Sequence, residues 1–208
     1  MSAEDLFQQL RHPNPHLRDR AMWAISEQRD ETTLPRLMAL LSEEDTNCRR
    51  AAVKALGLIG ADAVPPLVAA LQQENSVTVR GSAVKAIAQV VINYPDVPLS
   101  TEGVAALKQA LLDPNPVVNI AAVMALGEMG SPAVDILIDT LQATDNPALG
   151  VSLVNALGSI GDHRGIVVLN TLIQDESTDS YVRESALSAL SRLEMTATFR
   201  TNPAGEVP

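Results

Sequence analysis

The sequence contains very few aromatic residues. Of its 208 residues only 2 % are aromatic, namely one Trp, two Tyr and two Phe, although 46 % are hydrophobic. A core must therefore be built mainly from Ala, Leu and Val, which favours closely packed helices over a β-sandwich or a β-barrel. The composition predicts an all-α fold.

Cysteine and basic residues are also scarce. Cys48 is the only cysteine, which rules out an internal disulfide bond and makes a reducing compartment the expectation. The 15 Lys and Arg residues are outnumbered by 25 Asp and Glu residues, so the formal net charge is −10. A chain this acidic is not expected to bind nucleic acid or an anionic membrane surface.

The chain lacks the sequence features of a secreted or membrane-inserted protein. Its first ten residues carry neither a basic segment nor a long apolar run, so we predict no signal peptide. No run approaches the roughly 18–20 consecutive apolar residues that are needed to cross a bilayer. We therefore expect a cytoplasmic protein without membrane insertion.

An internal repeat dominates what the sequence does contain. Six segments share a pattern that ends in a pivot alanine followed by Leu or Ile, at spacings of 31, 31, 39, 31 and 33 residues. The pivots are Ala24, Ala55, Ala86, Ala125, Ala156 and Ala189. Each pivot marks an inner helix, and a second, Leu-rich helix precedes it. The pattern predicts an α-α superhelix, a solenoid of about six helix-pair repeats, over residues 1–194.

The ends of the predicted inner helices are marked by local chemistry. Ten residues before each pivot stands a good N-cap residue. These residues are Asn14, Asp45, Ser76, Asn115, Asn146 and Asp179. Five residues after three of the pivots, Gly60, Gly130 and Gly161 suit a left-handed helix end.

Two segments depart from the repeat. The long spacing comes from an insertion at 92–101, whose Asn-Tyr-Pro-Asp and Val-Pro elements favour an extended loop or turn. Residues 195–208 hold Gly and two Pro without an apolar period, and we expect a disordered tail. The outer faces of the first helix (Ala3–Leu10) and the last (Ser180–Leu193) are not obviously polar. A solenoid end without a polar cap suggests that a partner covers it.

The repeats resemble HEAT repeats, and more narrowly the HEAT-like repeats of the phycobilin lyase family. The resemblance is carried by R-R-A-A-V-K-A-L-G-L-I-G-A-D-A-V-P-P-L at Arg49–Leu67 and by N-I-A-A-V-M-A-L-G-E-M-G-S-P-A-V at Asn119–Val134. The opening R-H-P-N-P-H-L-R-D-R-A-M-W-A-I at Arg11–Ile25 is most similar to the smaller, beta subunit of the heterodimeric members.

The resemblance implies a lyase subunit that helps to attach phycocyanobilin, an open-chain tetrapyrrole, to a cysteine of a phycobiliprotein such as the phycocyanin alpha subunit. The implied partners are a second lyase subunit, the phycobiliprotein and the bilin itself, which is a substrate, so no cofactor is expected. Two alternatives stay open because a HEAT-like fold does not fix an activity. They are a non-catalytic adaptor that binds a partner protein, and a bilin-detaching relative in phycobilisome turnover.

One stripe of each inner helix varies between repeats, at five before, one before and three after the pivot, a spacing that places it on one helix face. We expect stacked inner helices to turn this stripe toward the concave side. It combines a basic cluster with an apolar strip, which suits an amphipathic anion such as a tetrapyrrole with two propionates, or an amphipathic partner helix. Solvated lysines and packing against a flanking helix are the alternative. The predicted substrate-binding residues are Arg50, Lys54, Lys85, Ile120, Met124 and Val151.

Trp23 also lies on the stripe, where it is predicted either to form a partner interface or to cover the first helix. Cys48 shares its column of the repeat with Leu and Val, so it is interpreted as a buried core thiol. His12, His16 and His163 lack metal-ligand spacing, and no metal site is predicted. His12 is interpreted as a turn residue.

No catalytic residue is assigned from the sequence. If the protein transfers a proton, Asp19, Glu27 and Glu128 are stripe residues that have suitable side chains. A further recurring feature is an arginine six residues before the pivot. We interpret it as a structural ladder that reaches acidic or carbonyl groups between neighbouring repeats. Its members are Arg18, Arg49, Arg80 and Arg183.

Overall fold

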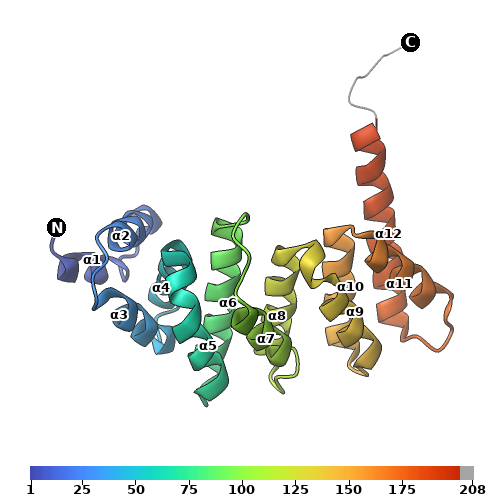
Figure 1. Ribbon diagram of the computed structural model, residues 1–208, viewed down its shortest axis with the longest axis horizontal. Helices are drawn as coiled ribbons and strands as arrows, with labels where there is room; N and C mark the ends of the chain where they lie inside the picture. The colour runs from blue at the N-terminus through green and yellow to red at the C-terminus, as the bar shows by residue number, and fades with distance from the viewer. Residues whose placement is uncertain (202–208) are drawn as a thin grey trace, which may run out of the picture. The chain divides into compact units, whose positions relative to one another are not determined.

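The computed structural model describes the backbone of residues 1–201 and the side chains of residues 1–193, and this part of the chain is helical with no β-strand (Figure 1). The inner helices are α2 (Pro15–Glu27), α4 (Thr46–Ile59), α6 (Val77–Asn93), α8 (Pro116–Met129), α10 (Pro147–Ile160) and α12 (Ser180–Thr201). The outer helices are α1 (Ala3–Gln9), α3 (Thr33–Ala39), α5 (Val64–Gln73), α7 (Thr101–Ala110), α9 (Val134–Ala143) and α11 (His163–Gln174). Short 3₁₀ turns are η1 (Leu40–Ser42), η2 (Gly60–Ala63) and η3 (Ser131–Ala133). The predicted all-α repeat of helix pairs is confirmed.

The chain divides into two compact units, Met1–Glu128 and the part from Met129 onward. In the first unit α2 packs on α4 and α4 on α6, while the outer helix α5 packs on α6 and α7. In the second unit α10 packs on α9 and α12, and α11 packs on α12. Each unit thus stacks helix pairs on their neighbours, which is how a repeat with an apolar face buries it.

Small and branched apolar residues fill the core of each unit, as the sequence predicts. One leucine of each outer helix from α3 onward is completely buried: Leu37, Leu67, Leu107, Leu137 and Leu169. Burial of each such side chain stabilises the fold by about 1.5–3 kcal/mol. Three residues before the pivot, an alanine is completely buried in five inner helices: Ala21, Ala52, Ala83, Ala122 and Ala186. These alanines allow the close approach of neighbouring helices.

The predicted helix starts are confirmed by hydrogen bonds. In all six inner helices the N-cap side chain accepts from a backbone N–H of the first turn. The predicted glycines also have positive φ, at 81° for Gly60, 70° for Gly130 and 69° for Gly161. Gly161 alone is in the left-handed helical region, with ψ 20°. Gly60 and Gly130 have ψ of −138° and −143°, a region that is essentially restricted to glycine.

Two segment boundaries differ from the prediction. Helix α6 continues to Asn93, so the irregular part of the predicted insertion at 92–101 is confined to residues 94–100. Helix α12 continues to Thr201, whereas the sequence predicted disorder from residue 195, because the first proline or glycine after its start is Pro203. Residues 202–208, which the same prediction covers, lie outside the described residues.

One stretch, Thr46–Gln73, is long and apolar enough to cross a membrane by length and composition, although no membrane span is predicted from uninterrupted apolar runs in the sequence. It contains the two helices α4 and α5, which η2 joins at Gly60. In its most apolar window, 67 % of the residues are buried inside the protein. This stretch is part of the protein core.

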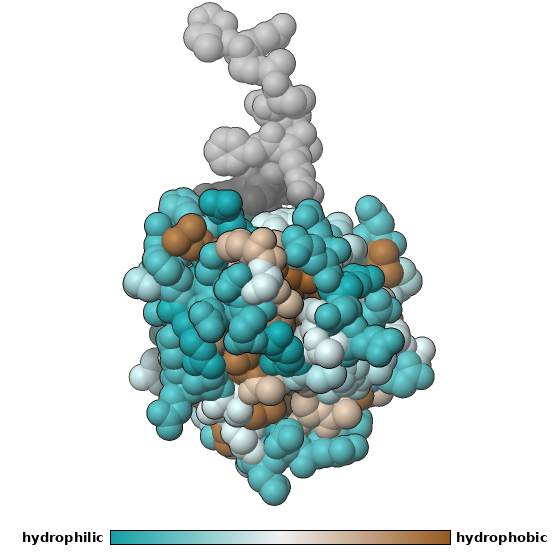
Figure 2. All heavy atoms as spheres, turned by 90° about the vertical axis from the view of Figure 1, so that its left-hand side faces the viewer, coloured by the Kyte–Doolittle hydropathy of each residue, from teal (hydrophilic) through white to brown (hydrophobic). Residues whose placement is uncertain are grey.

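The two end repeats differ in how they meet solvent. In α1, Leu6 and Phe7 are buried while Glu4, Asp5 and Gln8 are exposed. The prediction that the first helix lacks a polar outer face is therefore wrong. Figure 2 shows this side of the molecule as largely hydrophilic, with separate hydrophobic patches.

The last repeat, in contrast, leaves large apolar side chains exposed. Val167 of α11 is 51 % exposed, and Tyr181 and Leu187 of α12 are 71 % and 58 % exposed. The C-terminal repeat therefore carries the kind of uncapped apolar surface that the sequence suggested for both ends.

Candidate functional site

The stripe that the sequence predicts on the inner helices faces solvent. The residue just before each pivot alanine is exposed in all six repeats: Trp23, Lys54, Lys85, Met124, Asn155 and Ser188. Because the next residue in four of these helices is a completely buried alanine, the side chain before it is directed away from the core. Trp23 is 58 % exposed, so most of its side chain is not buried against α1.

The basic cluster lies on two helices that pack against each other. Arg50 and Lys54 stand one turn apart on α4, and Lys85 stands on α6; all three are exposed. Lys54 Nζ lies 3.9 Å from Asp19 Oδ1 of α2, and both side chains are more than half exposed. An ion pair this exposed contributes at most about 1 kcal/mol. The ammonium group of Lys54 therefore remains available to a ligand anion.

The apolar strip is only partly as predicted. Met124 is 65 % exposed on α8, and Ile120, one turn before it, is half-buried. Val117, which is not among the residues predicted from the sequence, is 52 % exposed on the same face. Its spacing of three residues from Ile120 is the signal that could have indicated it. Val151 is half-buried on α10, which belongs to the second unit.

The arginine ladder binds backbone carbonyls at the start of the inner helices. Arg18 donates to the carbonyl oxygens of His12 and Pro13 at 2.6 and 2.9 Å, and Arg80 donates to those of Glu74 and Asn75 at 3.1 and 2.9 Å. Arg49 makes the equivalent contacts with Glu43 and Glu44. These carbonyls lie in the loop that joins the outer and inner helices of one repeat, so the predicted contact between neighbouring repeats is wrong for Arg18 and Arg49. Each arginine satisfies carbonyls of the loop that leads into its own inner helix.

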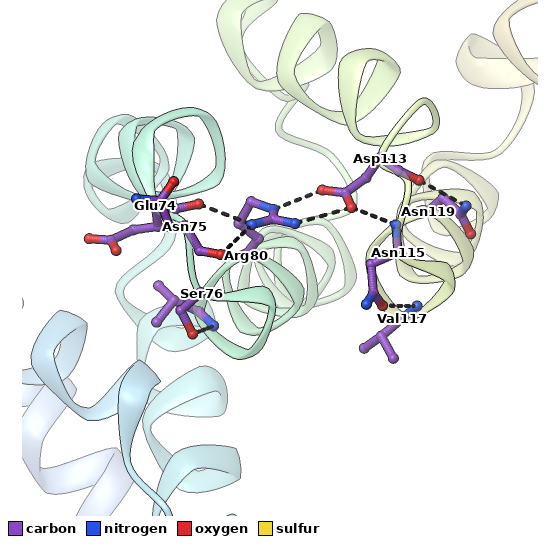
Figure 3. A network of polar contacts seen from close by, with 9 residues as sticks. Glu74, Asn75, Ser76, Arg80, Asp113, Asn115, Val117 and Asn119 are labelled. Carbon is purple, nitrogen blue, oxygen red and sulfur yellow. Dashed lines mark hydrogen bonds and ion pairs between the residues drawn. The ribbon is translucent and has the colours of Figure 1, made fainter.

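Arg80 additionally joins two repeats. Its guanidinium group donates to both carboxylate oxygens of Asp113, at 2.8 and 3.2 Å, and the two side chains are only 16 % and 10 % exposed (Figure 3). These hydrogen bonds hold the pKa of Asp113 below its usual range and raise the pKa of Arg80. At the position equivalent to the arginine in the next repeat, Asn119 donates its amide to the carbonyl of Asp113 at 3.1 Å. The arginines of the ladder therefore stabilise loops and, at Arg80, the contact between two repeats, which agrees with the structural role predicted from the sequence.

The remaining candidates are structural or exposed. Cys48 is completely buried, and burial raises the pKa of its thiol, so the core-thiol prediction is confirmed. His12 Nδ1 accepts from the N–H of Asn14 at 3.0 Å, which confirms it as a turn residue. Asp19 and Glu27 flank Trp23 in an open hollow of about 450 Å³. No group of three metal-binding side chains occurs in the part of the chain that the structure describes.

Comparison with known proteins identifies the repeat. The family model of HEAT repeats matches residues 3–88 and 104–191. The chain is a HEAT-repeat protein. The residues between the two matches, 89–103, contain the end of α6 and the whole insertion, so the insertion is not part of the HEAT pattern.

This HEAT-repeat protein has two relatives with bilin-related names. It is 63 % identical over 202 residues to phycocyanin operon protein Z of Pseudanabaena tenuis (strain PCC 7409), covering 97 % of this chain and 100 % of the relative. It is 34 % identical over 175 residues to the bilin biosynthesis protein CpeZ of Synechococcus sp. (strain WH8020), covering 81 % of this chain and 94 % of CpeZ. The chain belongs to the family of these two proteins.

Solved structures share the fold. The complex of CpcE and CpcF of phycocyanin lyase from Nostoc sp. PCC7120 matches with a TM-score of 0.51 and 17 % identity, over 74 % of this chain and 96 % of that chain. Kap121p bound to Pho4p matches with a TM-score of 0.58 and 16 % identity, over 96 % of this chain and 26 % of that chain. At these identities the likeness shows a common architecture of stacked helices.

Proposed function

We propose that this HEAT-repeat protein is a subunit of a bilin lyase, which helps to attach phycocyanobilin to a cysteine of a phycobiliprotein, the phycocyanin alpha subunit. We further propose that it works as a heterodimer with a second lyase subunit, in the role of the smaller, beta subunit. The observation that carries the proposal is the sequence relation to CpeZ, a protein named for bilin biosynthesis, over 94 % of that relative's length. The relation to a phycocyanin operon protein supports it.

The chemistry of bilin attachment suits a protein that mainly holds its substrates. A cysteine thiol of the acceptor adds to the ethylidene group of the bilin: a carbon–sulfur bond forms, and the thiol proton moves to the bilin. No atom leaves and no oxidant or reductant is consumed. Positioning two reactants in this way contributes several kcal/mol to a reaction between them.

The inner-helix stripe is the surface that we propose for the bilin. Arg50, Lys54 and Lys85 offer cations to the two propionates, while Ile120 and Met124 offer apolar contact to the pyrrole rings. Val151, on α10 of the second unit, is proposed as a separate apolar contact for the substrate. Trp23, exposed at the first inner helix, is proposed to contact the partner subunit.

Reconstitution tests the function directly. The chain is co-expressed with a partner lyase subunit, the bilin-synthesis enzymes and the apo-phycocyanin alpha subunit, and bilin that stays bound after denaturation is measured by fluorescence. We expect covalently bound bilin well above that in cells without this chain. Equal amounts in both would contradict the lyase role and leave the adaptor.

The proposed anion contact is tested by charge reversal on the stripe. Free phycocyanobilin is titrated with the protein and the change in its absorbance is followed. We expect K54E/K85E to bind the bilin at least about tenfold more weakly, because two attractive charges become repulsive ones, each worth roughly 1 kcal/mol.

Lys108 provides the matched control, since it is exposed on the outer helix α7, away from the stripe. K108E makes the same charge change as K85E and is expected to leave the titration unchanged. If K54E/K85E also binds like the unaltered protein, the basic cluster is not part of the bilin site.

A further inference from the structure

The insertion builds a cavity in the first unit that is absent from the repeat pattern. The cavity measures about 510 Å³ and lies between the start of α5, the end of α6 and the irregular segment 94–100. Its wall is mainly apolar and includes Val64, Val90, Val91, Tyr94, Val97 and Leu99. We call it the insertion pocket.

The insertion pocket is held open by specific contacts. The Tyr94 hydroxyl donates to the carbonyl oxygen of Leu58 at 2.6 Å, which fixes the start of the insertion to the end of α4. Gly60 allows this approach, because a Cβ atom there would lie 2.8 Å from Tyr94 Cε2. The N–H of Val97 donates to the carbonyl of Tyr94 at 3.0 Å and closes a turn. These contacts fix the conformation of the insertion, so the shape of the pocket is defined by the fold.

Its size and lining indicate a small ligand with apolar rings. Binding sites for small molecules typically measure about 300–1,000 Å³ and combine apolar walls with a few polar groups. A single apolar side chain of a partner protein is much smaller than this volume. Val97 of the insertion lines the pocket and is 55 % exposed.

The charged groups of the pocket supply one cation. Arg29, from the loop after α2, lines the pocket and pairs with Asp62 at 3.2 Å, but the two side chains are 48 % and 72 % exposed. So weak a pair leaves the guanidinium group free to turn to a ligand carboxylate. Glu102 at the start of α7 is the acidic lining residue. A carboxylate of the ligand is therefore expected beside Arg29 and away from Glu102.

We propose that the insertion pocket binds one end of the bilin, with one of its two propionates on Arg29 and the other left to the stripe cations; this inference rests on the proposed function. The end that enters is the one remote from the ethylidene group, because the reactive end must stay open to the thiol of the acceptor. Leu58, whose carbonyl holds Tyr94, is itself the last stripe residue of α4. The insertion pocket and the stripe thus share one hydrogen-bonded contact, between Tyr94 of the pocket wall and Leu58 of the stripe.

Filling the pocket tests the inference with the full chain and free phycocyanobilin. V91W places an indole in the pocket, and we expect the dissociation constant measured by absorbance to rise at least tenfold. Val77 is the matched control, since it is also half-buried on α6 but stands at the opposite end of that helix. V77W is expected to bind within about twofold of the unaltered protein, with both folds checked by circular dichroism.

Two further measurements use milder changes. V97D alters an exposed residue at the pocket and adds a charge that repels the propionate, whereas V97N is its neutral counterpart; only V97D is expected to weaken binding several-fold. R29L is expected to weaken the binding of phycocyanobilin. It is expected to have little effect on the binding of the dimethyl ester of phycocyanobilin, which has no free carboxylate to pair with Arg29.

The outcomes separate the two proposals. If the unaltered protein shifts the bilin spectrum and V91W and V97D do so with the same affinity, the insertion pocket is not the bilin site, although the proposed function stands. If the unaltered protein causes no spectral change at all, the proposed function fails first. Loss of partner binding in V91W with unchanged bilin affinity would assign the pocket to a protein partner and overturn the inference.

Discussion

At the scale of single residues, the ion pair between Arg80 and Asp113 differs from the others in the described part of the chain. Its side chains are 16 % and 10 % exposed, whereas every other described pair includes a side chain at least 33 % exposed. Exposed pairs contribute little, but removing one partner of a shielded pair leaves a charge without its counterion. The stability of this inter-repeat contact therefore depends on both residues.

The substitution D113N tests this dependence. We expect it to lower the free energy of unfolding in urea by about 1–3 kcal/mol, because Arg80 loses a charged acceptor that is bound through two hydrogen bonds. Asp62 is the matched control, since it also pairs with an arginine but is 72 % exposed. D62N is expected to change stability by less than about 0.5 kcal/mol. Equal losses in the two variants would mean that burial does not decide the contribution.

The same pair predicts a pH dependence. Arg80 lowers the pKa of Asp113 in the folded state, so the unfolded chain takes up this proton at a higher pH than the folded one. The contribution is complete above the ordinary carboxyl pKa of about 4 and is lost as the pH falls through the lower folded pKa. The stability difference between the unaltered protein and D113N is therefore expected to be constant from about pH 8 to pH 5 and to shrink below about pH 4.

At the scale of helices, the sequence predicts most of the fold because the ends of the inner helices carry local signals. The N-cap at Asn14 and the positive φ at Gly60 depend on neighbouring backbone atoms alone, and both are confirmed. For Arg18 and Arg49 the prediction of contacts between repeats is wrong, because residue spacing does not show the direction in which a long side chain turns. The insertion pocket was not predictable either, since it requires Tyr94 to reach Leu58, 36 residues away.

Gly60 and Gly130 have similar backbone angles, so alanine substitutions at the two positions distinguish the effect of backbone strain from that of a steric clash. Gly130 has nothing within 4 Å of a Cβ position, so G130A is expected to cost only the backbone strain of about 1–3 kcal/mol. G60A is expected to cost more, because its Cβ atom also meets the Tyr94 ring. Free energies of unfolding from urea titrations followed by circular dichroism provide the comparison.

The double variant G60A/Y94A isolates the contact. Once the ring is removed, the methyl group at residue 60 has no clash, so its cost in the Y94A background is expected to fall to that of G130A. If G60A lowers the free energy of unfolding equally with and without Y94A, the ring of Tyr94 does not contact residue 60. The close packing of the insertion on Gly60 would then be contradicted.

At the scale of the molecule, the two ends of the repeat array serve different purposes. The first helix presents Glu4, Asp5 and Gln8 to solvent and acts as a cap. The last repeat exposes the large side chains of Tyr181 and Leu187. Burial of these side chains by a partner subunit would contribute to the free energy of association. Trp23 is the contact proposed for the partner subunit in the first unit, and the exposed side chains of the last repeat are a second candidate surface for that subunit.

A repeat array with two compact units also predicts local, not global, responses to destabilisation. In such an array each repeat is stabilised mainly by its nearest neighbours. Gly158 of α10 contacts α12, where an added Cβ atom would lie 2.6 Å from Ala189 Cβ. In hydrogen exchange followed by mass spectrometry, we expect G158A to speed exchange in α10 and α12 and to leave α4 and α6 unchanged.

Gly165 of α11 is the control, because its Cβ position meets only ordinary contacts at 3.4 Å. G165A is therefore expected to slow amide exchange in α11 or to leave it unchanged. Faster exchange in α4 and α6 as well would show that the two units open as one, and that a partner bound at the last repeat is coupled in stability to the bilin surface of the first.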